Sequence, residues 1–146
     1  FEKVIGYLLF KAHRVMANRL FNNLREQGFD ITTEQWMLLV HLWNDDGLNQ
    51  NTLAKQCGRD KTTITRAIDN LEKLDLVVRV KDKKDARVRH IYLTDKAKSL
   101  QEQVIPVIQE TIEQAQDGIG LYDLEITKDT LKKIYKNLSP YEEDEE

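Results

Sequence analysis

The fold predicted from this sequence depends most on residues 48–71, which read LNQNTLAKQCGRDKTTITRAIDNL. Asn49 belongs to the residue types favoured at helix N-caps, so a short helix is expected directly after it. Gly58 then permits a tight reversal of the chain. Asp60 predicts the N-cap of a second helix, which runs to about Leu74. Two short helices joined at a glycine have the pattern of a helix-turn-helix.

The second helix is predicted to be amphipathic. Its apolar residues, Ile64, Ala67, Ile68 and Leu71, follow the i, i+3, i+4, i+7 spacing of a buried helix face. The opposite face and its flanks carry hydroxyl, amide and charged side chains: Lys61, Thr62, Thr65, Arg66, Asp69, Asn70 and Lys73. A recognition helix presents such side chains to base edges in the DNA major groove, although many polar helix faces are only solvated.

Two segments with an alternation of period two follow the helices. Residues 77–81 (VVRVK) and 89–93 (RHIYL) each predict a short strand, and the polar loop between them carries Arg87 and two lysines. A narrow minor groove attracts arginine, so we expect Arg87 to enter it while the lysines contact phosphates. Asp85 is expected to orient an arginine through a charge-assisted hydrogen bond.

Charge is divided unevenly along the 146 residues. The net charge is −3, but residues 53–98 hold 13 basic and 7 acidic residues, a net of +6. The remainder holds 9 basic and 18 acidic residues, a net of −9. A basic segment inside an acidic frame is the electrostatic pattern expected of a phosphate-binding surface.

Both ends of the chain are predicted to be helical and strongly apolar, over residues 1–27 and 95–138. In a chain of this size, a second subunit is the expected cover for such helices. Pro106 predicts a kink or break, and Thr127 predicts the N-cap of the last helix. Residues 139–146 are expected to form an acidic tail.

A further helix is expected over about Thr33–Trp43, after a capping box formed by Thr32 and Gln35. One side of this helix is predicted to carry the following residues: Trp36, Leu39, Val40 and Trp43. The predicted fold is therefore mainly α, an α+β winged helix in one domain over residues 1–146. Residues 30–94 would form the DNA-binding lobe.

These motifs resemble the MarR family of winged-helix transcription regulators. The resemblance is carried by residues 31–36 (ITTEQW), 53–58 (LAKQCG), 63–77 (TITRAIDNLEKLDLV), 85–87 (DAR) and 91–94 (IYLT). It implies a homodimer on a helical base that binds a pseudo-palindromic operator, with the flanking helices 1–27 and 95–138 as the dimerisation elements. Members of the family usually repress genes, and many release DNA when they bind a small aromatic ligand.

The resemblance also assigns residues to roles. The expected DNA contacts are Lys61, Thr62, Thr63, Thr65, Arg66, Asn70, Lys73, Lys83, Lys84, Arg87 and Arg89, with Asp85 holding the wing arginine. The expected ligand contacts are His13, Arg14, Trp36 and His41, each of which could equally be a core or hinge residue.

Other classes of function are less well supported by the sequence. No nucleophile triad, phosphate loop or carboxylate pair indicates an enzyme, and no metal-ligand spacing or cofactor motif is present. A winged helix that binds an acidic protein partner is the alternative to a DNA-binding regulator. The lack of a leader and of a long apolar run predicts a cytoplasmic protein without a membrane partner. Cys57 falls on an apolar stripe and is expected to pack in the core.

Overall fold

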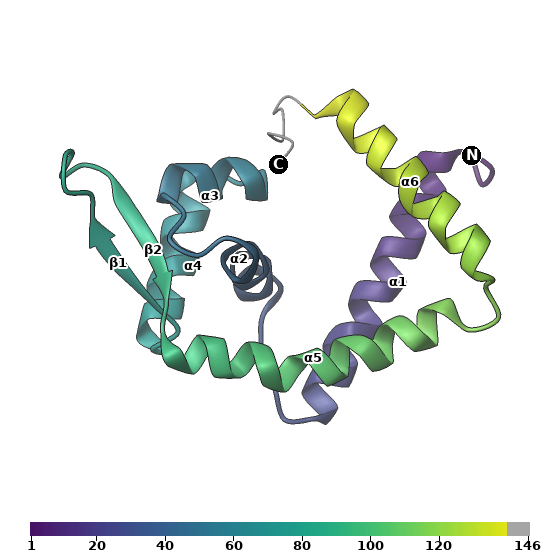
Figure 1. Ribbon diagram of the computed structural model, residues 1–146, viewed down its shortest axis with the longest axis horizontal. Helices are drawn as coiled ribbons and strands as arrows, with labels where there is room; N and C mark the ends of the chain where they lie inside the picture. Colours follow the sequence, from purple (N-terminus) through teal and green to yellow (C-terminus); the bar gives the residue numbers. More distant parts are fainter. Residues whose placement is uncertain (140–146) are drawn as a thin grey trace. The chain divides into compact units, whose positions relative to one another are not determined.

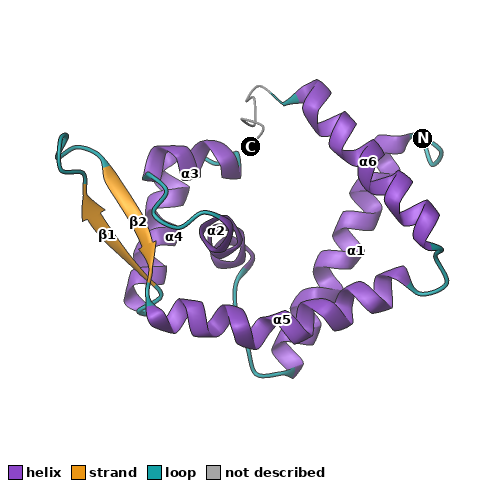
Figure 2. Cartoon of the chain, in the orientation of Figure 1, coloured by secondary structure: helices purple, strands orange, loops and turns teal. Residues whose placement is uncertain are grey.

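The computed structural model describes residues 1–139, as six helices and one two-stranded antiparallel sheet (Figure 1 and Figure 2). In chain order the elements are α1 (Ile5–Glu26), α2 (Thr33–Asn44), α3 (Gln50–Cys57), α4 (Lys61–Lys73), β1 (Val77–Lys81), β2 (Arg89–Leu93), α5 (Asp95–Gln116) and α6 (Leu121–Leu138). The predicted acidic tail lies outside the described residues apart from Ser139. No helix within residues 1–139 is long and apolar enough to cross a membrane.

The chain divides into two compact units, Phe1–Thr111 and Ile112–Glu146. The first contains α1 to α4, the sheet and most of α5. Within the described part of the second lie the last residues of α5 and all of α6, which has no buried residue. The candidate site belongs entirely to the first unit.

Local capping signals place the helices of the first unit where the sequence predicts them. The hydroxyl of Thr32 accepts from the backbone N–H of Gln35 (3.2 Å), and the Gln35 side chain accepts from the N–H of Thr32 (3.1 Å). This capping box starts α2. The side chain of Asn49 accepts from the N–H groups of Asn51 and Thr52, and so starts α3. Thr94 caps α5 by accepting from the N–H of Ala97.

The main hydrophobic core joins α2, α3, α4 and the inward side of the sheet. Its fully buried side chains include Leu38, Leu39, Leu42, Leu53, Ile64, Ile68, Leu71 and Ile91. The apolar stripe predicted for α4 is confirmed, because all four of its residues are buried. Burying each such side chain contributes about 1.5–3 kcal/mol before the entropy of ordering is subtracted.

A second, smaller core joins α1 to α5 around Leu24, Val104 and Val107. Trp36 and Trp43 pack against it, with their rings edge to face at 5.6 Å between centroids. The four residues predicted to lie along one side of α2 are all buried or half-buried. The helix has further buried residues, Leu38 and Leu42, which belong to the main core.

Two expectations for the C-terminal helices differ from the structure. The break predicted as one effect of Pro106 is wrong, because α5 continues through this residue as one helix, and the alternative of a kink stays a prediction. Pro106 lies on the exposed side of α5, where water can replace the backbone hydrogen bond that proline cannot donate. The last helix begins at Leu121 rather than after Thr127. The hydroxyl of Thr127 instead donates to the carbonyl of Asp123 inside the helix (2.7 Å).

The sheet confirms both predicted strands at their predicted bounds. β1 and β2 pair in the register Val77 with Leu93 through Lys81 with Arg89. β2 also bonds to the α2–α3 loop, since the N–H of Gly47 donates to Ile91 and the N–H of Ile91 donates to Leu48. The hairpin is thus attached to the loop that precedes the helix-turn-helix.

Candidate nucleic-acid interface

The helix α4 is fixed at both ends by local hydrogen bonds. At its N-cap, the Asp60 carboxylate accepts from the backbone N–H of Thr63 (2.7 Å) and from the Thr63 hydroxyl (3.1 Å). These bonds hold the pKa of Asp60 below its ordinary value. At the C-terminal end, Asp75 has a left-handed φ of 58°, and the N–H of Leu76 closes the helix on the carbonyl of Leu71 (2.9 Å).

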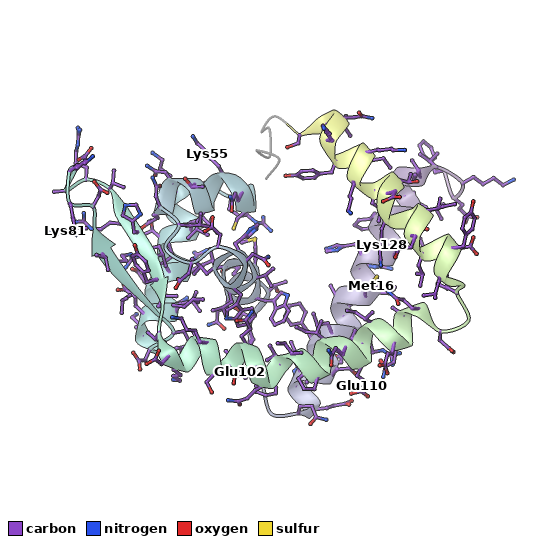
Figure 3. All side chains as sticks on the ribbon, in the orientation of Figure 1. Met16, Lys55, Lys81, Glu102, Glu110 and Lys128 are labelled. Carbon is purple, nitrogen blue, oxygen red and sulfur yellow. The ribbon has the colours of Figure 1, made fainter. Side chains whose placement is uncertain are left out.

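The outer face of α4 has the polar side chains that the sequence predicts. The exposed residues of this face are Lys61, Thr62, Thr65, Arg66, Asn70 and Lys73. Thr63 differs from them, because it is half-buried and its hydroxyl belongs to the Asp60 cap. Lys55 on α3 and Lys81 at the end of β1 point outward from the same lobe (Figure 3). The outer face therefore presents hydroxyls, an amide and several cations to solvent.

The tip of the hairpin, residues 82–88, is organised by Asp82. Its carboxylate accepts from the backbone N–H groups of Lys84 (2.9 Å) and Asp85 (3.0 Å). The N–H of Val88 then donates to the carbonyl of Asp85 (3.0 Å), which closes the turn. The side chains of Lys83 and Lys84 are exposed. We call strands β1 and β2 together with this tip the wing.

Arg87 is held at the tip by Asp85. The Arg87 Nε donates to Asp85 Oδ1 (3.1 Å), and Arg87 Nη2 donates to Asp85 Oδ2 (3.2 Å). These bonds lower the pKa of Asp85, so the carboxylate stays ionised. The predicted pairing is thus present in the structure, while 91% of the Arg87 side chain remains exposed. A bidentate pair fixes the plane of the guanidinium without covering it.

His90 attaches the wing to the α2–α3 loop. Its Nδ1 lies 3.2 Å from the carbonyl oxygen of Gly47, and its Nε2 lies 2.9 Å from Asp82 Oδ1. Both partners accept hydrogen bonds, so only an imidazolium with two N–H groups satisfies both. Two hydrogen bonds raise the pKa of His90, and the bond to Asp82 has a larger effect than the bond to Gly47.

A hollow of about 400 Å³ lies between the wing, α4 and the start of α3. Arg79, Arg87 and Arg89 line it from the wing, and Gln50 and Thr65 line it from the two helices. The side chain of Gln50 donates to the Thr65 hydroxyl (2.9 Å). The guanidinium of Arg89 donates to the carbonyl of Ala86. A polar hollow with three arginines between two exposed basic elements can accept an anionic, elongated ligand such as a nucleic-acid strand.

Comparison with known proteins identifies this arrangement. A profile of the MarR family matches residues 31–88. The HTH-type transcriptional regulator SarZ of Staphylococcus aureus is 30% identical over 99 residues, which are 68% of this chain and 66% of SarZ, just under two thirds of its length. The chain belongs to the MarR family.

Solved structures of MarR-family and other regulators confirm the winged-helix fold. A MarR transcriptional regulator from Methanosarcina mazei Go1 has a TM-score of 0.81 at 26% identity, covering 91% of this chain and 94% of its own. BpsR of Bordetella bronchiseptica, whose DNA binding is regulated by 6-hydroxynicotinic acid, has a TM-score of 0.78 at 19% identity. The BpsR comparison covers 92% of this chain and 94% of that one.

Among residues 1–139, no contact brings together the four residues that the MarR resemblance predicts to bind a ligand. His13 and Arg14 are exposed on α1, where the Arg14 guanidinium lies over the ring of Phe10 at 5.9 Å. Trp36 packs between the rings of Phe21 and Trp43, and His41 is half-buried on α2. None of the four lines the hollow. Their role in binding a ligand stays a prediction.

Sequence reasoning missed several residues of this MarR-family lobe. Arg79 and Gln50 both contact α4, and His90 and Asp82 fix the wing. Arg79 offered one signal, because it is a charged residue at the inward position next to Val77, which is apolar and buried. Cys57 is half-buried against the main core, as predicted, and burial raises the pKa of its thiol to about 11.

Proposed function

We propose that this chain is a sequence-specific, double-stranded-DNA-binding regulator of transcription. The observation that carries the proposal is the pairing of two exposed elements in one lobe. The polar face of α4 lies beside a wing whose Arg87 is oriented by Asp85 yet 91% exposed. In this proposal α4 reads base edges in the major groove, and Arg87 enters the adjacent minor groove.

Two further observations support DNA as the partner. The segment from residue 53 to residue 98 carries a net charge of +6 within a chain of net charge −3, so its cations are concentrated on the lobe. SarZ is a transcriptional regulator with a helix-turn-helix, and BpsR binds DNA. The proposed contacts are those predicted from the sequence, on α4, at the wing tip and at Arg89. The protein is proposed to act in the cytoplasm.

We further propose a homodimer. α1 exposes large apolar side chains in its first turns, including Leu8 and Phe10, and α6 exposes Leu121, Tyr122 and Tyr135. Apolar surface of this extent in a protein is typical of an interface. A two-fold dimer would bind a pseudo-palindromic operator whose half-sites are centred about 10 base pairs, or one helical turn, apart.

The proposed regulator is a repressor that a small aromatic ligand releases from DNA. The support is the regulation of BpsR by 6-hydroxynicotinic acid, an aromatic acid, in a protein of the same fold. His13, Arg14, Trp36 and His41 remain the residues proposed to contact such a ligand. A panel of aromatic acids added to the protein–DNA complex tests this part, because release by none of them contradicts it.

Selection of bound duplexes from random double-stranded DNA tests the central proposal. The expected result is an enriched pseudo-palindromic sequence. In a footprinting experiment, the parent protein is expected to protect both half-sites of this sequence from cleavage. Arg87→Ala is expected to weaken binding to the enriched duplex by about tenfold to a hundredfold, since a charge-assisted contact is lost. Arg66→Ala is expected to reduce discrimination between the enriched duplex and random DNA.

Lys133→Gln is the matched control, because it removes one positive charge from the exposed side of α6. If Arg87→Ala and Arg66→Ala both bind like the parent protein and the control, these residues do not contact DNA. Failure to enrich any sequence would refute sequence-specific binding. If no duplex is enriched but the protein binds an acidic protein in a separate binding experiment, the alternative of a winged helix that binds an acidic protein partner is favoured.

A further inference from the structure

Arg79 connects the two DNA-contacting elements of the lobe. It lies on β1, and all of its side-chain partners lie on α4. Its Nη1 is 2.6 Å from Asp69 Oδ1 and also contacts the Glu72 carboxylate, while its Nη2 donates to the backbone carbonyl of Thr65 (3.1 Å). We propose that Arg79 is a positioning residue that sets the recognition helix against the wing, so that both grooves are read in one register. This inference rests on the proposed function.

The position of Arg79 in the strand supports a specific role. β1 alternates, and Val77 on the inward side is buried in the main core. Arg79 occupies the next inward position, where an apolar residue would extend that core, and only 20% of its side chain is exposed. Placing a guanidinium at such a position costs desolvation, which its hydrogen bonds and ion pairs have to offset. Here those bonds reach three successive turns of α4.

The partners of Arg79 carry charge that DNA would otherwise meet. Asp69 lies beside the polar face of α4, and 48% of its side chain is exposed. Glu72 is one turn further along and is 36% exposed. Both carboxylates would repel the phosphate backbone if they were free. Arg79 neutralises part of this negative charge from the side that faces the wing. The carboxylates therefore weaken the attraction between the cations of α4 and the DNA phosphates less than free carboxylates would.

The contact with Thr65 extends the effect of Arg79 to the middle of the recognition face. Thr65 is one of the exposed residues expected to meet bases, and its hydroxyl accepts from Gln50 of α3. Its backbone carbonyl accepts from Arg79. The turn of α4 that carries Thr65 is therefore held from α3 on one side and from β1 on the other. A shift of the wing would then move this turn as well.

Arginine is suited to this task and lysine is not. The planar guanidinium presents donors in a fixed fork, so that Arg79 can bind two carboxylates and a carbonyl simultaneously. An ammonium keeps the charge but lacks this geometry. Arg79→Lys therefore separates neutralisation of charge from positioning.

The decisive variant leaves Arg79 in place and removes its partners. Asp69→Ala with Glu72→Ala makes the lobe more positive by two charges, and alanine suits an exposed helix. Simple electrostatics predicts tighter binding to every duplex. Positioning predicts tighter binding to random DNA but a fall of about tenfold to a hundredfold in the ratio of affinities for the selected and random duplexes, the range expected when hydrogen bonds to a charged group are lost.

The control removes the same charge elsewhere. Glu102→Ala with Glu113→Ala alters two exposed residues of α5, outside the wing and α4. The affinity ratio of this control is expected to equal that of the parent protein. Affinities are measured at two salt concentrations, and thermal unfolding is followed for every variant. Arg79→Lys is expected to keep the salt dependence of the parent protein but to lose the affinity ratio.

Each outcome decides the matter. A fall in the ratio for Asp69→Ala with Glu72→Ala, at an unfolding temperature well above that of the assay, supports positioning by Arg79. An unchanged or larger ratio overturns it, and so does an Arg79→Lys protein that retains the full ratio. A parent protein that selects no duplex refutes the proposed function instead. If Arg79→Lys does not fold, the double alanine variant alone gives the answer.

Discussion

The contact between Gly47 and Tyr92 gives a sharp stability prediction for the base of the wing. Gly47 has a φ of +80°, and a Cβ added there would lie 2.6 Å from Tyr92 Cε1 and 2.9 Å from Cζ. Normal carbon contacts are about 3.5–4.0 Å, so the ring has to move by about 1 Å or swing outward. Gly47→Ala is therefore expected to be more destabilising than an ordinary substitution at a left-handed glycine.

The magnitude has two parts. A left-handed φ costs a residue with a Cβ about 1–2 kcal/mol. Tyr92 is 41% exposed, so swinging its ring out would uncover about half of a surface of roughly 200 Å², or about 2.5 kcal/mol at 25 cal/mol/Å². A smaller movement of the ring would cost less. Gly47→Ala is expected to destabilise the lobe by about 2–4 kcal/mol in total.

Gly58 provides the matched control within the same lobe. Its φ is +60°, and a Cβ there would meet no atom within 4 Å. Gly58→Ala is expected to cost only the backbone part, about 1–2 kcal/mol. The free energy of unfolding is measured in urea for both variants and for each combined with Tyr92→Ala. In the Tyr92→Ala background, Gly47→Ala should cost no more than Gly58→Ala. Equal costs of the two glycine variants in the parent background would refute the reasoning.

Two further predictions concern titratable groups. The pKa of His90 is raised by Asp82 and the Gly47 carbonyl, so its stabilising contribution is complete below about pH 6.5 and is lost as the pH rises through the higher pKa of the folded state. The unfolding midpoint of the parent protein should exceed that of His90→Gln by more at pH 6 than at pH 9, and an equal difference at both would contradict this. Burial raises the pKa of the Cys57 thiol to about 11, so alkylation at pH 8 should be slow until the protein is unfolded. Native alkylation as fast as that of a free thiol would contradict the buried position.

The features that the sequence predicts well are those set by neighbouring residues. Thr32, Asn49 and Asp60 cap the helices that follow them, because a short polar side chain satisfies orphan N–H groups within three residues. The pairing of Asp85 with Arg87 is local for the same reason. The strands have the predicted bounds because alternation separates an inward side from an exposed one.

The errors in predicting secondary structure arise where the same residue type can occupy more than one kind of position in a helix. Thr127 resembles an N-cap, but inside a helix its hydroxyl bonds to the carbonyl of Asp123. The true start of α6 follows Gly120, which offers no side-chain cap to detect. The side predicted for α2 is incomplete because this helix packs on two cores, so residues on two sides are at least half-buried. Periodicity identifies one buried side and cannot say how many neighbours a helix has.

The partners of Arg79 and His90 could not be predicted, because each lies far away in sequence or on another element. Arg79 reaches back to Asp69 and Thr65 across a turn, and His90 reaches Gly47 across 43 positions. The pattern shows only that a charged residue occupies an inward position. Its partner depends on how the wing lies against α4, which is a property of the fold.

These long contacts explain how a two-stranded hairpin keeps a fixed place. Such a hairpin is marginal by itself in water, and the outward side of the wing leaves Val78 and Val80 exposed. Besides the inward apolar residues and the backbone hydrogen bonds between β2 and the α2–α3 loop, two side chains hold the wing to the rest of the lobe. Arg79 pairs with carboxylates of α4, and His90 contacts the carbonyl oxygen of Gly47. Ion pairs at half-exposed sites weaken with salt, and the bond of His90 weakens as its proton is lost. The position of the wing is therefore expected to respond to salt and pH at conditions that leave the apolar core of α2, α3 and α4 unchanged.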